Sequence, residues 1–222
     1  MATILFDLDG TLVETGPDLL AATNGVLAEN GVEPIAIDHL GHLVGQGGRA
    51  MLERAFALRG RPATESELDE HVPRFLDLYE RSIPGTSVPF PGCVAALDRL
   101  ADAGHALAVC TNKPERMSIE LLEALGLAER FKAICGPDTF GVRKPDPAHI
   151  LRTVERAGGE RSAAIMVGDS ISDVEAARRA DVPSIGVPFG YSDRPIAELD
   201  PTVVIEHFDE LDEALVARLL AR

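Results

Sequence analysis

Two aspartates near the N-terminus have the type and spacing of catalytic carboxylates. Asp7 and Asp9 stand two positions apart in the stretch FDLDGTL, residues 6–12. The run before them, residues 2–6, is short and apolar, which is typical of a buried strand in a parallel sheet. Two carboxylates at the exit of a buried strand are costly to desolvate unless a cation or a reaction accounts for them. The pattern therefore indicates a cation site or reaction chemistry.

The next two residues, Gly10 and Thr11, are suited to holding a phosphate. Glycine permits a sharp turn, and such a turn presents backbone N–H groups to whatever lies between the carboxylates. The arrangement suits a divalent metal and a phosphate held together. Short motifs of this kind also occur in solvated turns, so this stretch alone leaves the simpler interpretation open.

Three later stretches add side chains for the same chemistry. They are Thr111, Asn112 and Lys113; Lys144 within RKPDP, residues 143–147; and Asp169 and Asp173 within GDSISD, residues 168–173. Taken singly, each also fits a turn, a helix cap or a solvated side chain. Together they supply carboxylates for a metal, a hydroxyl donor, an ammonium and free N–H groups. This is the set that phosphoryl transfer needs, because positioning and charge neutralisation carry most of its catalysis.

The apolar pattern predicts a sheet that brings these stretches together. We expect helices over 93–103, 115–125, 147–157 and 173–180, a terminal helix from about 209, and strands over 2–6, 106–110, 133–134, 163–167, 183–187 and 203–205. Alternating βα units imply an α/β fold with a doubly wound, Rossmann-like parallel sheet. Ligands of such sheets bind outside the carboxyl ends of the strands, where all four stretches fall.

Residues 14–85 have a helical rhythm instead. The apolar spacing predicts helices over about 19–30, 49–58 and 65–81, with no convincing strand between them. Because strand 2–6 must belong to the sheet, this segment is predicted to be an all-helical cap domain inserted after the first strand. The core then comprises residues 1–13 and 86–222, and linkers near 12–17 and 82–91 join the two parts.

Composition excludes some classes of partner. The chain has 222 residues and a formal net charge of −15, with a pI of about 4.7. Nucleic acid and anionic membranes are bound by clustered Lys and Arg, so neither is expected as a partner. An anionic substrate must be captured by local positive groups. The only lysines are Lys113, Lys132 and Lys144.

The cysteines and the N-terminus point to the cytoplasm. Cys93, Cys110 and Cys135 form no CxxC pair, and an odd count is typical of reduced thiols. The sequence shows no secretory leader and no apolar run approaching ~18 residues. We therefore expect a soluble cytoplasmic protein, either a monomer or a homodimer.

The four stretches, in this order, resemble the four motifs of the haloacid dehalogenase-like hydrolase superfamily, and the resemblance spans the whole chain. Within that superfamily, several segments are similar to phosphoglycolate phosphatases. These segments are ETGPDLL at 14–20, VGQGGRAML at 44–52, FPGC at 90–93 and TNKP at 111–114. Glu14 is a departure, because these phosphatases commonly have Asp at this position. This difference does not affect the motif carboxylates and concerns only the start of the linker into the cap.

The resemblance implies a role for each motif carboxylate. Asp7 would be the nucleophile that forms an aspartyl-phosphate. Asp9 would protonate the leaving group and then activate water. Mg²⁺ would be held by the Asp7 carboxylate, the Asp9 backbone carbonyl and Asp169, a set of oxygen ligands that suits this ion. Asp173 would not bind Mg²⁺ directly but would orient the groups that do.

Further roles follow from the same resemblance and from residue chemistry. Thr111 would bond a phosphoryl oxygen, and Lys144 would pair with the nucleophile and the phosphoryl group, with Lys113 as a rival for that role. Substrate contacts are also expected from Gly10, Thr11, Asn112, Lys113, Gly47 and Arg49. In the cap, the glycines before Arg49 permit close approach of an anion to a helix N-terminus, and Arg49 could pair with a small carboxylate. The alternative is that these glycines only form a turn and Arg49 is solvated.

The predicted function is hydrolysis of a small anionic phosphate monoester, with 2-phosphoglycolate the best fit. A sugar phosphate, an amino-sugar acid 6-phosphate or pyrophosphate remains open as substrate. The dehalogenases of this superfamily lack an aspartate at the position of Asp9, so the presence of Asp9 argues against dehalogenase activity. The segment 14–82 contains no lysine, which argues against Schiff-base chemistry in the cap. The residues also leave open two further functions, a phosphoglucomutase-type phosphotransferase and a non-catalytic phosphate-binding module.

Overall fold

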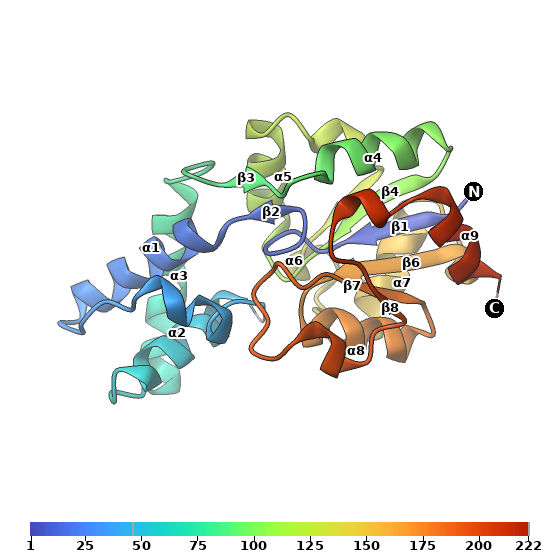
Figure 1. The fold of residues 1–222 in the computed structure, drawn as a ribbon. Coiled ribbons are helices and arrows are strands. Elements are labelled where there is room, and N and C mark those ends of the chain that lie inside the picture. The colour runs from blue at the N-terminus through green and yellow to red at the C-terminus, as the bar shows by residue number, and fades with distance from the viewer. Residues whose placement is uncertain (46, 222) are drawn as a thin grey trace.

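A parallel sheet forms the centre of the molecule (Figure 1). The computed structural model describes residues 1–45 and 47–221. In these residues six strands pair in the order β5-β4-β1-β6-β7-β8, all parallel. The strands are β1 (Thr3–Phe6), β4 (Ala106–Cys110), β5 (Ala133–Cys135), β6 (Ala164–Gly168), β7 (Ser184–Gly186) and β8 (Val203–Val204). The predicted α/β fold is confirmed.

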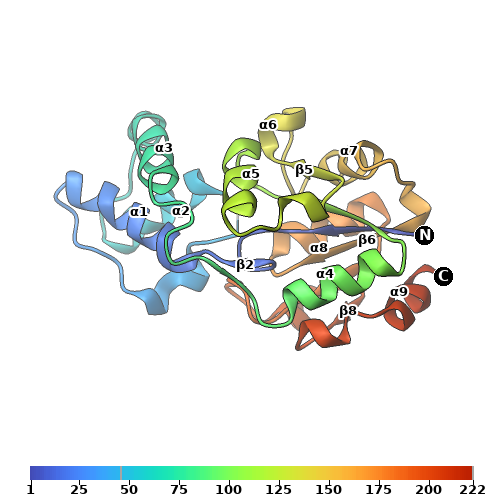
Figure 2. The same cartoon turned by 90° about the horizontal axis from the view of Figure 1, so that it is seen from above.

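Helices cover both faces of this sheet (Figures 1 and 2). One face, which includes Ile4 and Phe6 of β1, packs against α4 (Cys93–Asp102), α5 (Glu115–Ala124) and α9 (Glu213–Leu220). The other face, which includes Leu5, packs against α7 (Pro147–Arg156) and α8 (Ile171–Ala180). Because both faces are buried, β1 is continuously apolar rather than alternating. This is why a short apolar run identified it as a strand.

The strand order places three of the sequence motifs side by side. β1 lies between β4 and β6, and Phe6 is in register with Val109 on one side and Val167 on the other. From β1 the chain continues to β4 and β5 on one side of the sheet, and later to β6, β7 and β8 on the other. The carboxyl ends of β1 and β6 therefore form the switch point at which doubly wound sheets bind their ligands.

The helical segment forms a separate layer beside the carboxyl ends of the strands (Figure 1). It contains α1 (Gly16–Glu29), α2 (Gly48–Leu58), α3 (Glu65–Glu80) and a 3₁₀ turn, η1 (Ile37–His42). These helices bury a second apolar cluster, to which α1 contributes Val26 and Leu27, α2 contributes Leu52 and Phe56, and the core adds Met117 and Tyr191. We call residues 14–85 the helical unit.

Two features of the chain differ from the sequence-based expectation. Val13–Glu14 (β2) and Val88–Pro89 (β3) pair as an antiparallel ribbon at the linkers, and two residues are too few to give a periodic signal. The terminal helix expected from about 209 is divided, because the Asp212 side chain accepts from Leu215 N and starts α9 there. The remaining short elements are α6 (Pro137–Phe140), η2 (Ala128–Arg130), η3 (Arg161–Ala163), η4 (Ile196–Leu199) and η5 (Phe208–Glu210).

Hydrogen bonds join the two segments that connect the helical unit to the sheet domain. Asp18, in the first turn of α1, accepts hydrogen bonds from Thr86 N at 2.9 Å and Ser87 Oγ at 2.7 Å. The β2–β3 ribbon lies next to this contact in the chain. In the described part of the chain, no helix has the length and apolar character needed to cross a membrane.

Candidate active site

Asp7 lies at the carboxyl end of β1 and is 5% exposed. Its Oδ1 accepts from Leu8 N at 2.7 Å and lies 3.0 Å from Lys144 Nζ. Burial raises the pKa of Asp7 to about 6, Lys144 opposes this shift, and the carboxylates of Asp173 and Asp9 add to it. Both of these contacts involve the same oxygen, so the geometry leaves Oδ2 as the oxygen available to an incoming group.

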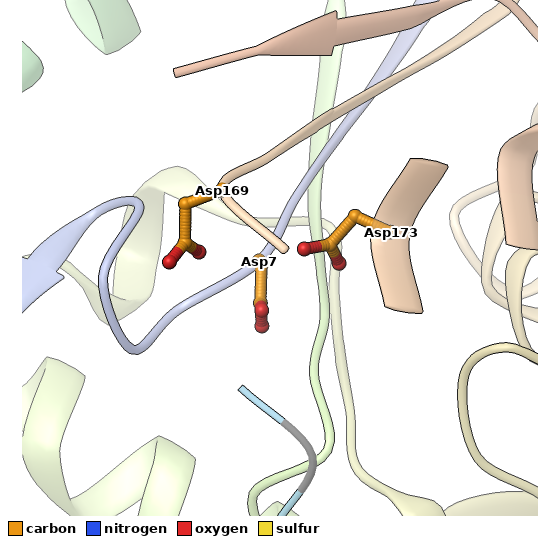
Figure 3. A group of neighbouring side chains, drawn as sticks. All are labelled: Asp7, Asp169 and Asp173. Carbon is orange, nitrogen blue, oxygen red and sulfur yellow. The ribbon is translucent and has the colours of Figure 1, made fainter. Parts of the chain in front are cut away.

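Asp7 is one of three buried carboxylates that meet at this edge of the sheet (Figure 3). Asp7, Asp169 and Asp173 each offer an oxygen, and these oxygens lie within 4.8 Å of one another. Burial, followed by the charges of Asp173 and Asp7, raises the pKa of Asp169 to about 8. Three carboxylates this close repel one another, and one ammonium does not balance them. The cluster has the oxygen donors and the excess negative charge of a divalent-cation site.

Asp169 is held in a fixed orientation. Its Oδ1 accepts from Thr11 Oγ1 at 2.8 Å, and its Oδ2 accepts from Tyr191 N at 2.7 Å. Gly10 has a φ of +83°, and a Cβ at this position would lie 2.5 Å from Asp169 Oδ2. Glycine is therefore required at residue 10 both by its backbone conformation and by the approach of this carboxylate.

The turn itself differs from the expected phosphate cradle. We predicted that Gly10 and Thr11 present free N–H groups, but Gly10 N donates to Val13 O and Thr11 N donates to Leu8 O. The tight turn satisfies its own backbone, and the Thr11 side chain is bonded to Asp169. In the structure these two residues position a carboxylate rather than contact the cavity.

Asp173 and Lys144 form a buried ion pair behind Asp7. Lys144 is 2% exposed, and its Nζ donates to Asp173 Oδ1 at 2.6 Å. Asp173 Oδ2 accepts from Ser170 N and Ser170 Oγ in the capping box that begins α8. Both oxygens of Asp173 are thus bonded to protein groups, and its carboxylate positions Lys144 beside Asp7.

Asn112 fixes the loop that carries this lysine. Its side-chain amide donates to Lys144 O at 3.1 Å, and its Oδ1 accepts from Lys144 N at 3.0 Å. The loop after β4 is thereby attached to the loop before α7. Asn112 also lines the cavity, but its amide group is used to hold Lys144 in place.

Asp9 has a cationic partner of its own. Lys113 Nζ lies 2.9 Å and 3.2 Å from the two carboxylate oxygens of Asp9, and Thr15 Oγ1 donates to Asp9 Oδ1 at 2.7 Å. The family resemblance gave Lys144 as the partner of the nucleophile, with Lys113 as a rival. The structure places Lys144 at Asp7 and Lys113 at Asp9.

A small cavity opens onto these groups. Its volume is about 50 Å³. The core contributes Asp7, Asp9, Thr111, Asn112, Lys113, Pro114 and Met117, and the helical unit contributes Leu19, Val44, Gly45, Gly47, Gly48, Met51, Phe75, Leu76 and Tyr79. Among the described residues that line it, Lys113 is the one cation. The helical unit therefore supplies mostly apolar and glycine walls, and the core supplies the charged ones.

The structure does not bring Arg49 to this cavity. Its guanidinium pairs with Glu65 Oε2 at 2.5 Å and with Asp69 Oδ1 at 2.6 Å. Both acids lie on the neighbouring helix α3, so Arg49 joins two helices at the surface of the helical unit. Gly47, which we also assigned to substrate binding, does line the cavity. Gln46, in the same segment, lies outside the described residues.

Sequence reasoning missed three residues around the site. Tyr79 lies in the helix predicted over about 65–81 and has no chemical signal of its own, yet its ring contacts Lys113, with 3.9 Å between Nζ and the ring centroid. Thr15 donates to Asp9, and the Tyr191 hydroxyl accepts from Gly16 N at 2.7 Å. None of these residues belongs to a motif with a chemical signature, so only the fold could reveal them.

This geometry can carry out phosphoryl transfer. Asp7, with one available oxygen, lies beside two further buried carboxylates and an ammonium. A fourth carboxylate, Asp9, is reachable by solvent, since its side chain is 16% exposed. A nucleophile, a charge-neutralising group and an acid/base are the parts that a stepwise transfer through the enzyme requires.

Comparisons with known proteins agree with this interpretation. Residues 4–187 match the family model of haloacid dehalogenase-like hydrolases. A phosphoglycolate phosphatase of Agrobacterium fabrum is 52% identical to this chain, over 98% of this chain and 94% of the relative. A phosphoglycolate phosphatase of Mesorhizobium japonicum is 48% identical, over 98% and 96% respectively.

A solved structure shows the same fold over nearly the whole chain. It is described as a predicted phosphoglycolate phosphatase from Haemophilus somnus, and it is similar to this chain with a TM-score of 0.86 and 28% identity. The alignment covers 95% of this chain and 96% of that one. Sequence, fold and site geometry thus agree, and the chain belongs to the haloacid dehalogenase-like hydrolases as a phosphoric monoester hydrolase.

Proposed function

We propose that the protein hydrolyses 2-phosphoglycolate to glycolate and phosphate through an aspartyl-phosphate, with Mg²⁺ as cofactor. The observation that carries this proposal is the cluster of Asp7, Asp169 and Asp173 at the switch point of the sheet, next to a small cavity that Asp9 and Lys113 line. The relatives named phosphoglycolate phosphatase support the choice of substrate.

The first step uses Asp7 as the nucleophile. Its free carboxylate oxygen, Oδ2, attacks phosphorus and the bond between phosphorus and the glycolate oxygen breaks. Asp9, as the acid, protonates that leaving oxygen. Lys144, 3.0 Å from Asp7 Oδ1, reduces the repulsion between the carboxylate and the phosphoryl anion. Thr111, which lines the cavity at the end of β4, donates its hydroxyl to a phosphoryl oxygen.

The second step returns the enzyme to its starting state. Asp9, now a carboxylate, takes a proton from water, and the water oxygen attacks phosphorus of the aspartyl-phosphate. The bond between phosphorus and the Asp7 oxygen breaks, which releases phosphate and restores the Asp7 carboxylate. Thr15 and Lys113 both bond the Asp9 carboxylate and keep it directed at the cavity.

The residues present fit Mg²⁺. Asp7 and Asp169 would supply carboxylate oxygens, and the Asp9 backbone carbonyl would supply a third. Asp173 would stay behind them, since its Oδ1 is already paired with the Lys144 ammonium, whereas Asp169 accepts only from the neutral donors Thr11 Oγ1 and Tyr191 N. The raised pKa values of Asp7 and Asp169 support this proposal, because a cation would offset both their burial and the repulsion between the carboxylates. When bound, Mg²⁺ would neutralise negative charge on the phosphoryl group.

The cavity supports a small anionic substrate. Its volume is about 50 Å³ and its walls come from both the core and the helical unit, which favours a compact ester. A hexose phosphate needs more room than 2-phosphoglycolate. Lys113 supplies the positive charge that a second anionic group on the substrate requires.

We further propose that the helical unit, residues 14–85, acts as a cap domain that covers the site and excludes water during catalysis. Its walls Gly47, Met51 and Phe75 form one side of the cavity, which supports this role. The cytoplasmic location expected from the sequence is part of the same proposal, and the cysteines, all free, support it.

The test is phosphate release from a panel of esters, with and without Mg²⁺. The panel contains 2-phosphoglycolate, several sugar phosphates, an amino-sugar acid 6-phosphate and pyrophosphate. We expect kcat/KM for 2-phosphoglycolate to exceed the others by ~100-fold, which is ~2.7 kcal/mol of differential transition-state binding. Equal activity across the panel would contradict the proposal that 2-phosphoglycolate is the substrate. Activity without Mg²⁺ would contradict the proposal that Mg²⁺ is the cofactor.

A further inference from the structure

The Lys113 ammonium is in contact with both parts of the molecule. Lys113 follows β4 in the core, and its side chain is 4% exposed. Its Nζ lies 2.9 Å from Asp9 Oδ1 and 3.9 Å from the centroid of the Tyr79 ring. Tyr79 belongs to α3 of the helical unit. One buried cation thus joins a core carboxylate to an aromatic face of the helical unit.

The Tyr79 ring is a rigid support for that cation. It is 2% exposed and belongs to the apolar cluster of the helical unit. It stacks on Phe75 of the same helix, with 6.4 Å between ring centroids. Lysine, by contrast, carries its charge on a flexible four-carbon stem. An aromatic face attracts an ammonium most strongly where water is excluded, so this contact restricts where the charge can lie.

The face of the Tyr79 ring contacts the ammonium. The hydroxyl also lies near enough to interact with Lys113, although it makes no hydrogen bond of good geometry within the described part of the chain. Burial raises the pKa of Tyr79, so the phenol is neutral and contributes no negative charge to the contact. A phenylalanine at this position would keep the face, whereas a leucine would remove it. The two substitutions therefore separate the two parts of the side chain.

We propose that Tyr79 is a positioning residue that holds the Lys113 ammonium at the cavity wall, where it binds the second anionic group of a carboxylate-bearing phosphate ester. This inference rests on the proposed function and adds a determinant of substrate choice. Without the ring, Asp9 remains as the partner of the ammonium, and the flexible side chain is free to leave the wall. Binding of the substrate carboxylate then weakens, whereas binding of an ester with a neutral aryl group is little affected.

The test compares Tyr79→Leu and Tyr79→Phe on 2-phosphoglycolate and on 4-nitrophenyl phosphate. For Tyr79→Leu we expect KM for 2-phosphoglycolate to rise ~10-fold more than KM for 4-nitrophenyl phosphate. Because Lys113 also bonds Asp9, any fall in kcat should be the same for both esters. Tyr79→Phe should restore KM to within about 2-fold of the wild type. If the Phe variant loses as much as the Leu variant, the hydroxyl is the important group and the proposal is wrong.

A double variant tests whether Tyr79 acts through Lys113. Lys113→Met alone removes the charge that Tyr79 positions, so adding Tyr79→Leu to it should cause little further loss on 2-phosphoglycolate. Effects that multiply instead would show that the two side chains act independently, because uncoupled sites are additive in free energy. That outcome would overturn the proposal.

Phe56→Leu is the matched control for packing. Phe56 is fully buried in the same apolar cluster, stacks on His71 and does not line the cavity. Its variant should lose thermal stability yet keep the ratio of KM values for the two esters. If the control changes that ratio as Tyr79→Leu does, loosened packing explains both and the inference fails. A wild type inactive on every ester would instead contradict the proposed function itself.

Discussion

Lys144 Nζ lies 3.0 Å from Asp7 Oδ1, in a position that is almost fully shielded from water. The same ammonium lies 2.6 Å from Asp173 Oδ1. Burial alone would lower the pKa of Lys144, but Asp173 and Asp7 raise it well above its usual value, so the side chain is charged. The lysine therefore contributes to stability as well as to the proposed chemistry.

Substitution of Lys144 by Met should remove both contributions. The variant leaves two buried carboxylates without their counter-ion, which costs about 3–5 kcal/mol of unfolding free energy. The expected kcat/KM is lower by ~10³-fold, as for loss of a group that stabilises developing charge. Urea unfolding and steady-state kinetics measure the two effects. Lys132→Met, which removes an exposed lysine, is the charge-matched control. Equal losses in the two variants would show that Lys144 has no special role.

Replacement of Asp9 by Asn should separate the two chemical steps. An aryl phosphate has a good leaving group, so it needs little help from an acid, whereas hydrolysis of the aspartyl-phosphate still needs a base. We expect the Asn variant to release about one equivalent of 4-nitrophenol per enzyme in a burst and then to turn over slowly. Rapid-mixing absorbance measures this. A linear time course at the wild-type rate would show that Asp9 is not the base.

The carboxylate cluster predicts how Mg²⁺ stabilises the fold. In the metal-free protein the pKa values of Asp7, about 6, and Asp169, about 8, exceed the usual 3.8. The folded state therefore holds protons that the unfolded chain has released, and its stability falls as pH rises towards about 8. Mg²⁺ replaces these protons, so the increase in Tm on adding Mg²⁺ should be larger at pH 8 than at pH 6.

The control for this pH dependence is Asp169→Asn, which removes the group with the higher pKa. Its metal-free Tm should fall less between pH 6 and pH 8, and Mg²⁺ should raise it little at either pH. Differential scanning fluorimetry measures all four conditions. A wild-type Mg²⁺ effect that is the same at both pH values would contradict the assignment of the cluster as the cation site.

Arg49 and Lys113 provide a direct test of which residue binds the substrate carboxylate. Arg49 pairs with Glu65 and Asp69 and does not line the cavity. We therefore expect Arg49→Ala to leave the KM for 2-phosphoglycolate within about 2-fold of the wild type, whereas Lys113→Met raises it by ~10-fold or more. A larger rise for Arg49→Ala, specific to 2-phosphoglycolate over 4-nitrophenyl phosphate, would restore the assignment made from sequence.

The sequence predicted the sheet and its motif residues well because their signals are local. Short apolar runs mark buried parallel strands, and Asp7, Thr111 and Asp169 follow such runs directly. The parallel register then requires that they meet at one edge. The helix ends were also predictable, as at Gly31 and Gly60, which follow α1 and α2 with positive φ.

The pairings between distant residues carried no local signal, and the contact of Lys144 with Asp7 was expected only from the family resemblance. No local signal indicated that Lys144 contacts Asp7 while Lys113 contacts Asp9, because both lysines follow strands or loops at the same edge. Arg49 was assigned from the glycines before it, yet the acids that bind it are set by the packing of α2 on α3. Tyr79 had only the periodicity of a core position.

The most direct test of the central claim is to detect phosphate on Asp7. Wild-type enzyme would be mixed with 2-phosphoglycolate and Mg²⁺, quenched in acid within one turnover and analysed by peptide mass spectrometry. The account predicts a phosphoryl adduct on the peptide that contains Asp7, and neither adduct nor turnover in Asp7→Asn, which should remain folded. Turnover without an adduct, together with wild-type activity in Asp7→Asn, would contradict the account.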